Sequence, residues 1–313
     1  MNPEIYILGS GSATPTRDRN PSAQILRIGN EKIMIDCGEG TQSQLIKYGV
    51  RHTGVDYICI SHLHGDHYFG LIGLISTMSL LGRKQTLHII GPPPLKQILD
   101  LQILHGGMTL KFEIVFYPTN PGRQEFVLRN ESFELTSFPL KHRIHCTGFL
   151  IKESKKERHL NMEVIESLDI PVAFYKDIKK GENFVSKSGE IIENTLLTSS
   201  AEPCKSYAYC SDTIFDPEIV AYIDGVNMLY HEATYMKNNE ERASLYFHST
   251  AEQAATIAKM ANVGQLIIGH FSSRYDHLEP LLQEAREVFS NTELAEEGEK
   301  FVITSSVGVL VHS

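Results

Sequence analysis

Short apolar runs bounded by turn residues dominate the first half of the chain, and these runs predict β-strands. Apolar residues at helical spacing predict helices at 41–48, 69–81 and 94–104. Several neighbouring runs resemble hairpins, so we expect a mixed sheet rather than a purely parallel one. The predicted strands are 5–8, 23–28, 32–35, 57–60, 86–90, 112–116, 125–128, 133–139 and 148–151.

The same core pattern returns in the last third of the chain, after a polar excursion. From 152 to 194 the chain carries many charges and few continuous apolar runs, whereas both flanks have the pattern of core strands. We therefore expect a single domain over 1–313 with an inserted flexible arm at 152–194. Ser249 and Thr250 ahead of Glu252 resemble a capped helix start. The elements predicted beyond the arm are strands at 206–210, 226–229, 265–268 and 301–311, and helices at 251–260 and 280–289.

Composition narrows the function classes. The net charge of −9 excludes a polycation held to nucleic acid by bulk attraction, so any nucleic-acid site must be local. The five cysteines lie far apart with no C-x-x-C pair, which favours a reducing, cytoplasmic location. We expect no membrane span, because no apolar run approaches the roughly 20 residues that cross a bilayer.

The segment 62–67 holds four potential metal ligands within six residues, directly after an apolar strand. In an extended loop His62 and His64 point the same way at period two, so both imidazoles reach one ion. Asp66 and His67 can face a second ion, because Gly65 relaxes the backbone before them. A single histidine in a loop more often just faces solvent. Four donors of the histidine and carboxylate types favour a catalytic metal site over a structural zinc site.

The sequence His-Leu-His-Gly-Asp-His at 62–67 resembles the H-x-H-x-D-H signature of the metallo-β-lactamase superfamily. The resemblance implies an α+β fold, a four-layer αββα sandwich, and two Zn²⁺ per subunit. It implies seven ligands: His62, His64 and His142 for one ion, Asp66, His67 and His270 for the other, and Asp212 bridging the two. Judged on the residues alone, His145 rivals His142, and Asp212 could simply cap a turn. Asp36, in the matching segment after an earlier strand, is not expected to be a ligand.

Two metal ions about 3.5–4 Å apart lower the pKa of a shared water and stabilise an in-line displacement at phosphorus. Phosphodiester hydrolysis is a natural use of such a centre. Asp66 neighbours that water and could also accept its proton.

Further segments resemble the ribonuclease Z family of tRNA 3′-processing endonucleases, over essentially the whole chain. They begin at Pro15, His231, His248 and His270 and read Pro-Thr-Arg-Asp-Arg-Asn, His-Glu-Ala-Thr, His-Ser-Thr and His-Phe-Ser-Ser-Arg-Tyr. The resemblance implies an endoribonuclease that removes the 3′ trailer from precursor tRNA, cutting after the discriminator nucleotide and leaving a 3′-hydroxyl. It implies that His248 contacts or protonates the leaving 3′-oxygen, and that Glu232 orients His248 and favours its charged form. The implied substrate contacts here are Arg17, Arg19, Asn20, Ser272 and Arg274.

The arm at 152–194 corresponds in position to the arm with which this family grips the tRNA elbow, although the family's Gly-Pro element is absent here. The resemblance also implies a homodimer and no organic cofactor. Three alternatives stay open: a small-substrate dizinc phosphodiesterase on the same fold, a non-catalytic RNA-binding protein, and a di-iron redox protein. The basic residues expected to contact tRNA are Lys152, Lys155, Lys156, Lys179 and Lys180.

Overall fold

The computed structural model describes residues 2–305, and most of them build two seven-stranded sheets. In the first sheet β18, β1, β2 and β3 pair antiparallel, whereas β3 to β6 pair parallel, so the predicted mixed sheet is confirmed. Its strands, in spatial order, are β18 (Lys300–Val302), β1 (Glu4–Gly9), β2 (Ala23–Ile28), β3 (Glu31–Cys37), β4 (Tyr57–Cys59), β5 (Leu87–Gly91) and β6 (Ile114–Pro118).

The second sheet is also mixed. Strands β14 to β17 run parallel, and β9 pairs with β14 antiparallel. Its strands, in spatial order, are β17 (Thr292–Leu294), β16 (Gln265–Gly269), β15 (Met228–Glu232), β14 (Ser206–Cys210), β9 (Thr147–Glu153), β8 (Phe133–Pro139) and β7 (Glu125–Arg129).

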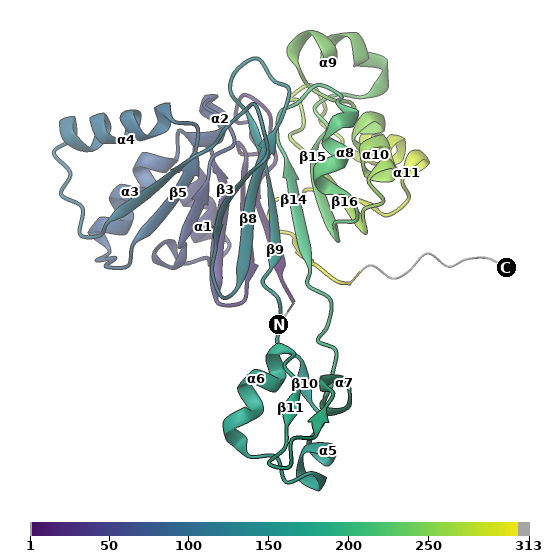
Figure 1. Ribbon diagram of the computed structural model, residues 1–313. Coiled ribbons are helices and arrows are strands. Elements are labelled where there is room, and N and C mark those ends of the chain that lie inside the picture. The colour runs from purple at the N-terminus through teal and green to yellow at the C-terminus, as the bar shows by residue number, and fades with distance from the viewer. Residues whose placement is uncertain (1, 306–313) are drawn as a thin grey trace. The chain divides into compact units, whose positions relative to one another are not determined.

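Three apolar layers hold the two sheets and their helices together. Because side chains alternate along a strand, Tyr207 and Tyr209 of β14 join the layer between the sheets, while Ala208 and Cys210 join the layer beneath the helices. This double burial explains why the central strands appear in the sequence as continuous apolar runs. Helices cover the outer face of each sheet, as Figure 1 shows, and give the four layers αββα.

The helices of the two outer layers mostly begin and end near their predicted limits. Helix α10 starts at the N-cap Thr250, whose capping-box partner is Gln253 rather than Glu252. The first sheet is accompanied by α1 (Thr41–Lys47), α2 (Gly65–Tyr68), α3 (Leu71–Leu80) and α4 (Pro94–His105). The second is accompanied by α8 (Val220–Ile223), α9 (Glu240–Tyr246), α10 (Ala251–Met260) and α11 (Glu279–Val288). Short 3₁₀ turns lie at His52–Gly54, Pro217–Ile219 and Lys237–Asn239.

Residues Glu153–Cys204 form a second compact unit with a core of its own. Five buried apolar side chains make this core, and the buried Asn194 donates to the carbonyls of Ile178 (2.7 Å) and Glu182 (2.8 Å). The unit ends ten residues beyond the arm boundary of 194 expected from the sequence. Its elements are β10 (His159–Leu160), α5 (Met162–Ser167), a 3₁₀ turn (Val172–Phe174), α6 (Tyr175–Lys180), β11 (Phe184–Val185), β12 (Ile191–Ile192), α7 (Asn194–Leu197) and β13 (Thr198–Ser199).

Two further expectations from the sequence concern the last strand and membrane-spanning helices. Of the strand expected at 301–311, β18 covers the beginning, and 306–311 lies outside the described residues. Within residues 2–305, every helix is too short or too polar to cross a bilayer.

Candidate metal centre

The seven candidate ligands all follow the carboxyl end of a strand. His62 and His64 lie in the loop after β4, and Asp66 and His67 lie in the helical turn of α2 that continues it. His142 follows β8, Asp212 follows β14 and His270 follows β16. The structure brings these separate segments together in two adjoining groups, and a third combination of nearby donors joins Asp212 and His270 to His248. Loops at the carboxyl ends of strands are where α/β proteins usually build their sites.

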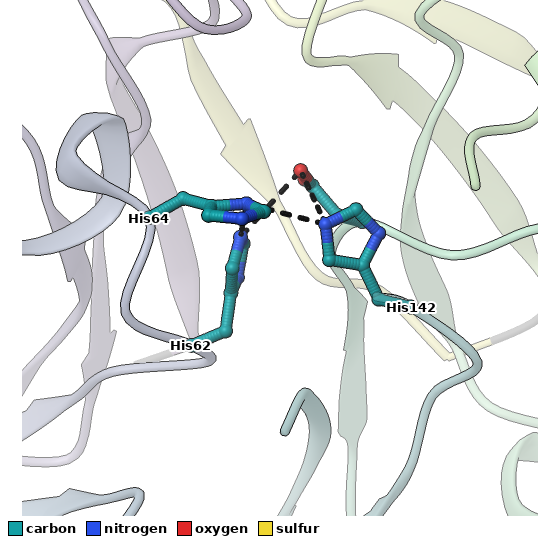
Figure 2. Close-up of side chains that lie close together, drawn as sticks. His62, His64 and His142 are labelled. Atoms are coloured by element: carbon teal, nitrogen blue, oxygen red, sulfur yellow. Dashed lines mark hydrogen bonds and ion pairs between the residues drawn. The ribbon is translucent and has the colours of Figure 1, made fainter. Parts of the chain in front are cut away.

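The first group contains His62, His64, His142 and Asp212, whose nearest donor atoms all lie within 4.8 Å of one another. Figure 2 shows the three imidazole rings turned toward one another. His64 Nδ1 lies 3.1 Å from His62 Nε2 and 3.2 Å from His142 Nε2. Burial lowers the pKa of all three histidines, which favours the neutral imidazole that binds metal ions.

The second group contains Asp66, His67 and His270. The two Nε2 atoms of the histidines lie 3.3 Å apart, and Asp66 Oδ2 lies 3.4 Å from each of them. Burial opposes ionisation of Asp66, but His67 and His270 outweigh it and hold the pKa of this carboxyl well below its usual range. A buried carboxylate among imidazoles is a donor set that suits a divalent cation.

Asp212 connects the two groups through its two oxygens. Oδ2 lies 3.6 Å from His62 Nε2, whereas Oδ1 lies 3.2 Å from His270 Nε2 and 3.4 Å from His67 Nε2. The turn-capping alternative is served by a different residue, because Asp216 accepts the backbone N–H at the start of the following 3₁₀ turn. Asp212 therefore presents one oxygen to each of the two groups.

The structure also separates His142 from its rival. His145 Nε2 lies 3.1 Å from the hydroxyl of Thr119, and His145 is absent from both groups of candidate ligands. His142 Nδ1 instead donates to the carbonyl of Phe247 at 3.0 Å, which leaves Nε2 facing the first group. The geometry therefore places His142, and not His145, among the candidate ligands.

Acceptors behind the ligands fix the outer nitrogens of two more histidines. Asp36 Oδ2 accepts from His67 Nδ1 at 2.7 Å and from the hydroxyl of Tyr209 at 2.7 Å. The hydroxyl of Thr234 lies 2.9 Å from His270 Nδ1. Each contact selects the tautomer whose lone pair is on Nε2. Sequence reasoning missed the part played by Thr234, although it lies inside the His-Glu-Ala-Thr motif.

Three residues without the freedom of glycine adopt left-handed backbone conformations around the centre. They are Asp36 (φ +56°), Phe247 (φ +60°) and His270 (φ +59°). Such conformations cost of order 1–3 kcal/mol each and persist where the surrounding structure holds them. Here each one aims a carboxylate, a carbonyl or an imidazole at the two ligand groups.

His248 and Glu232 form a charged pair beside the ligands. His248 Nδ1 lies 2.9 Å from Glu232 Oε1, and the fully buried Glu232 also accepts from the hydroxyl of Thr234 at 2.7 Å. Burial lowers the pKa of His248, but the charge and hydrogen bond of Glu232 outweigh burial and raise the pKa to about 9. His248 is therefore an imidazolium at neutral pH, with a proton available for transfer.

Gly65 was expected to relax the backbone before Asp66 and His67, and this physical reason is wrong. Gly65 is not among the residues with positive φ, and helix α2 begins at this residue. A Cβ atom at Gly65 would instead lie 2.3 Å from the ring of Phe69. Glycine at this position lets the Phe69 ring rest against the backbone of the ligand loop, and a larger residue would displace that ring.

The predicted substrate contacts near the amino terminus differ in their surroundings. The guanidinium of Arg19 donates to the carbonyl of Tyr275 at 2.7 Å, and the Asn20 amide donates to Glu297 at 2.9 Å. Arg17 is exposed, with no side-chain partner among residues 2–305. Arg19 and Asn20 thus anchor the loop, and Arg17 is the residue of this segment that is free to meet a ligand.

The other predicted contacts lie on two parts of the chain. Arg274 Nε donates to the hydroxyl of Ser272 at 3.3 Å, and the guanidinium lies 5.2 Å from the centre of the Tyr235 ring. Lys152 is exposed in β9, and the backbone carbonyl of Lys179 accepts from Arg158. Lys155, Lys156 and Lys180 line a cavity of the second compact unit, described below.

An open cleft of about 490 Å³ gives access to the ligand groups. Ser12, Ala13, Thr14 and Pro15 form part of its wall, and Ala13 N donates to Asp66 Oδ2 at 2.7 Å. Asp212, His248 and His270 also line it, so a substrate in the cleft meets the candidate ligands and the charged pair together.

Known proteins resemble this chain over nearly its whole length. Residues 3–169 match the family model described as "Anti-Pycsar protein Apyc1", and this part of the chain belongs to that family. Ribonuclease Z of Bacteroides fragilis is 45% identical over 294 residues, covering 94% of this chain and 97% of that protein. Ribonuclease Z of Parabacteroides distasonis is 46% identical over 297 residues, covering 94% and 97%. The chain belongs to the ribonuclease Z family.

Solved structures place this ribonuclease Z chain among metallo-β-lactamase folds. The short form of human tRNase Z has a TM-score of 0.71 at 26% identity, covering 96% of this chain and 99% of that chain. The metallo-β-lactamase fold protein YhfI from Bacillus subtilis has a TM-score of 0.68 at 18% identity, covering 96% and 99%. The predicted α+β fold, an αββα sandwich, is confirmed.

Proposed function

We propose that this protein is a zinc-dependent endoribonuclease that removes the 3′ trailer from precursor tRNA. It cuts after the discriminator nucleotide and leaves a 3′-hydroxyl. The observation that carries the proposal is the His248–Glu232 pair in the same cleft as the seven candidate ligands, in a chain of the ribonuclease Z family.

Two Zn²⁺ ions fit the donor set. Five imidazoles and two carboxylates converge, and the ionised Asp66 and the buried, ionised Asp212 favour positive charge beside them. The expected holders are His62, His64 and His142 for one ion and Asp66, His67 and His270 for the other, with Asp212 shared. When bound, such ions supply Lewis-acid stabilisation of a phosphoryl oxygen and acidify water.

The residues of the chain itself would then move two protons. Asp66 lines the cleft beside the other candidate ligands, and in this proposal its carboxylate accepts a proton from the attacking water. His248 holds a proton at neutral pH and is oriented by Glu232, which suits it to protonate the 3′-oxygen that leaves.

The proposed tRNA contact outside the cleft is a basic cavity in the unit Glu153–Cys204. The cavity measures about 640 Å³ and is lined by Lys155, Lys156, Arg158 and Lys180. Lys156 pairs with Glu153 at 3.0 Å, whereas Lys155 is exposed and forms no ion pair within residues 2–305. Lysine and arginine side chains on one surface bind the phosphates of RNA by charge and shape, without reading its sequence.

Removing the positive charges of this cavity is expected to weaken tRNA binding. The double variant Lys155→Ala/Lys180→Ala should bind precursor tRNA more weakly, with a salt dependence reduced by about 0.7–0.9 per lost phosphate contact. Hydrolysis of bis(p-nitrophenyl) phosphate should not change. Lys187→Ala is the matched control, because Lys187 is exposed in the same unit but does not line the cavity. Unchanged binding by the double variant would contradict this role.

Removing the metal is expected to lower the melting temperature. Without it the largely enclosed Asp66 and the buried Asp212 lose the cation for which their charges are placed, and a ligand at a hundredfold excess over its Kd stabilises by about 2.7 kcal/mol. Calorimetry of protein treated with EDTA and then refilled with Zn²⁺ measures the effect, and metal analysis counts the ions. A melting temperature that responds to neither treatment would contradict the assignment.

We also propose a homodimer that works in the cytoplasm. Leu80 and Leu81 at the end of α3 and Leu101 and Leu104 of α4 are between 55% and 79% exposed, which supports contact with a second copy. Four free cysteines are buried and Cys204 is exposed, a state that suits a reducing compartment.

The decisive experiment is cleavage of a 3′-extended precursor tRNA by the zinc-loaded protein, beside a tRNA that already ends in CCA. A single cut after the discriminator nucleotide is the expected result, and the CCA-ended tRNA tests the exposed Arg17. An intact precursor together with rapid hydrolysis of bis(p-nitrophenyl) phosphate would move the function to a small-substrate phosphodiesterase.

A further inference from the structure

One phenyl ring stands in the wall of the cleft. Phe69 follows α2 and is 61% exposed, although its neighbours in the wall are polar, charged or small. Single exposed apolar side chains are common on protein surfaces, so exposure alone carries no meaning. The position of Phe69, directly after the ligand loop, is what distinguishes it from the exposed apolar residues on the outer helices.

The backbone at Phe69 is held on both sides. Phe69 N donates to the carbonyl of Gly65 at 3.0 Å, and Gly70 N donates to the carbonyl of Cys37 at 2.9 Å. A Cβ atom at Gly70 would lie 2.2 Å from the carbonyl oxygen of Gly38, so the chain here is in tight contact with the end of β3. The ring is therefore mounted on a fixed support, and a ligand that contacts it orders little additional chain.

The ring itself lies against the ligand loop. The three atoms nearest to a Cβ built on Gly65 all belong to the Phe69 ring, at 2.3 to 2.7 Å. Gly65 lies between the candidate ligands His64 and Asp66. The ring thus contacts the segment that carries those ligands, while much of its surface remains open to the cleft.

A cation lines the same cleft. Arg143 directly follows the candidate ligand His142 and is exposed, and among residues 2–305 no carboxylate lies within ion-pair distance of it. Arginine presents a planar guanidinium that matches the oxygens of a phosphate. An aromatic ring and a free guanidinium in one cleft are the two elements with which proteins hold single-stranded RNA.

We propose that Phe69 and Arg143 form a nucleotide subsite beside the scissile bond. Phe69 stacks on the base of a nucleotide adjoining the cleaved phosphate, and Arg143 pairs with a flanking phosphate of the same strand. The inference rests on the proposed function and names how the cleft holds its RNA. Stacking accepts every base, because each base has a π-face, so it suits an enzyme that meets trailers of different sequence.

The test is a double-mutant cycle between the ring and the base. Phe69→Ala should lower kcat/KM for precursor tRNA by roughly 5- to 150-fold, the measured range for one base stacked on one aromatic side chain. An abasic residue at the discriminator or at the first trailer nucleotide should cause a similar loss for the unaltered protein, and at the stacked position little further loss for Phe69→Ala. Phe69→Tyr should restore stacking.

Two controls separate a subsite from a structural role. Zinc content and melting temperature should match those of the unaltered protein in every variant. Phe126→Ala is the matched control, because Phe126 of β7 is 60% exposed but does not line the cleft. Arg143→Ala should reduce the salt dependence of kcat/KM by about 0.7, the value for one phosphate contact to a single strand, and Arg143→Lys should restore it.

The outcomes distinguish a failure of the proposed subsite from a failure of the proposed ribonuclease function. If the unaltered protein leaves precursor tRNA intact, both fall. If it cuts precursor tRNA but Phe69→Ala is equally active, or loses the same factor on both abasic RNAs as on the normal one, the ribonuclease activity stands and the subsite is wrong.

Discussion

Asp66→Ala is expected to reduce cleavage of precursor tRNA by at least 10² to 10⁴-fold, roughly the contribution of one positioned proton acceptor. The loss should exceed that range where metal binding also fails, because Asp66 Oδ2 lies 3.4 Å from the Nε2 atoms of both His67 and His270. Binding of precursor tRNA should change little. Single-turnover cleavage and a separate filter-binding titration measure the two quantities.

The control for Asp66 removes a negative charge from the same cleft without touching the ligand groups. Glu39 lines the cleft, is exposed, and belongs to neither group. Glu39→Gln should therefore leave cleavage close to that of the unaltered protein. Retained turnover in Asp66→Ala would remove this carboxylate from the mechanism, whereas an equal loss in both variants would indicate a general effect of charge on RNA binding.

His248→Ala is expected to slow cleavage of precursor tRNA by about 10² to 10⁴-fold while leaving the zinc content intact. The reason is the leaving group. A ribose 3′-oxygen needs a proton as it departs, and His248 carries one because Glu232 raises its pKa to about 9 against the opposing effect of burial. Quenched-flow cleavage at saturating enzyme measures the chemical step.

A better leaving group tests the same assignment from the other side. p-Nitrophenolate departs as a stable anion and needs no proton, so His248→Ala should hydrolyse bis(p-nitrophenyl) phosphate with a much smaller loss than it shows on precursor tRNA. Glu232→Gln should show the same selectivity in weaker form, because the amide keeps the shape of the side chain but not its charge. Equal losses on both substrates would point to a misplaced centre rather than a missing acid.

The fold could be predicted from the sequence because, along most strands, the spacing of the apolar residues matches the set of side chains that the structure buries. The run at 206–210 is apolar on both faces, and both faces of β14 are buried. The unit Glu153–Cys204 gave no such signal, because its elements are two to six residues long and none buries more than one apolar side chain. Helix α9 was missed for a related reason: Leu245, its most apolar position, is 69% exposed, so no buried stripe marks it.

The four donors at 62–67 could be recognised from their spacing after a strand, whereas His142, Asp212 and His270 were expected only through the resemblance to the metallo-β-lactamase superfamily. The hydrogen bonds that orient these ligands could not be predicted from the sequence. Nothing in the spacing of His142 and His145 says which imidazole turns inward, and the hydrogen bond of His145 to Thr119 decides it. The hydrogen bond from His142 to the carbonyl of Phe247 could not be predicted either. It depends on a left-handed backbone conformation at Phe247, and the residue type phenylalanine gives no indication of that conformation.

Neither sheet alone supplies a complete group of ligands. The loop after β4 gives His62 and His64 to one group and leads into Asp66 and His67 of the other, while His142, Asp212 and His270 come from the second sheet. A bound ion is therefore a crosslink between the halves of the sandwich, and its binding energy is folding energy. Chain order separates the two groups: the first is complete once Asp212 has been synthesised, whereas the second also needs His270 after β16, so the second ion can be held only when nearly the whole chain has left the ribosome.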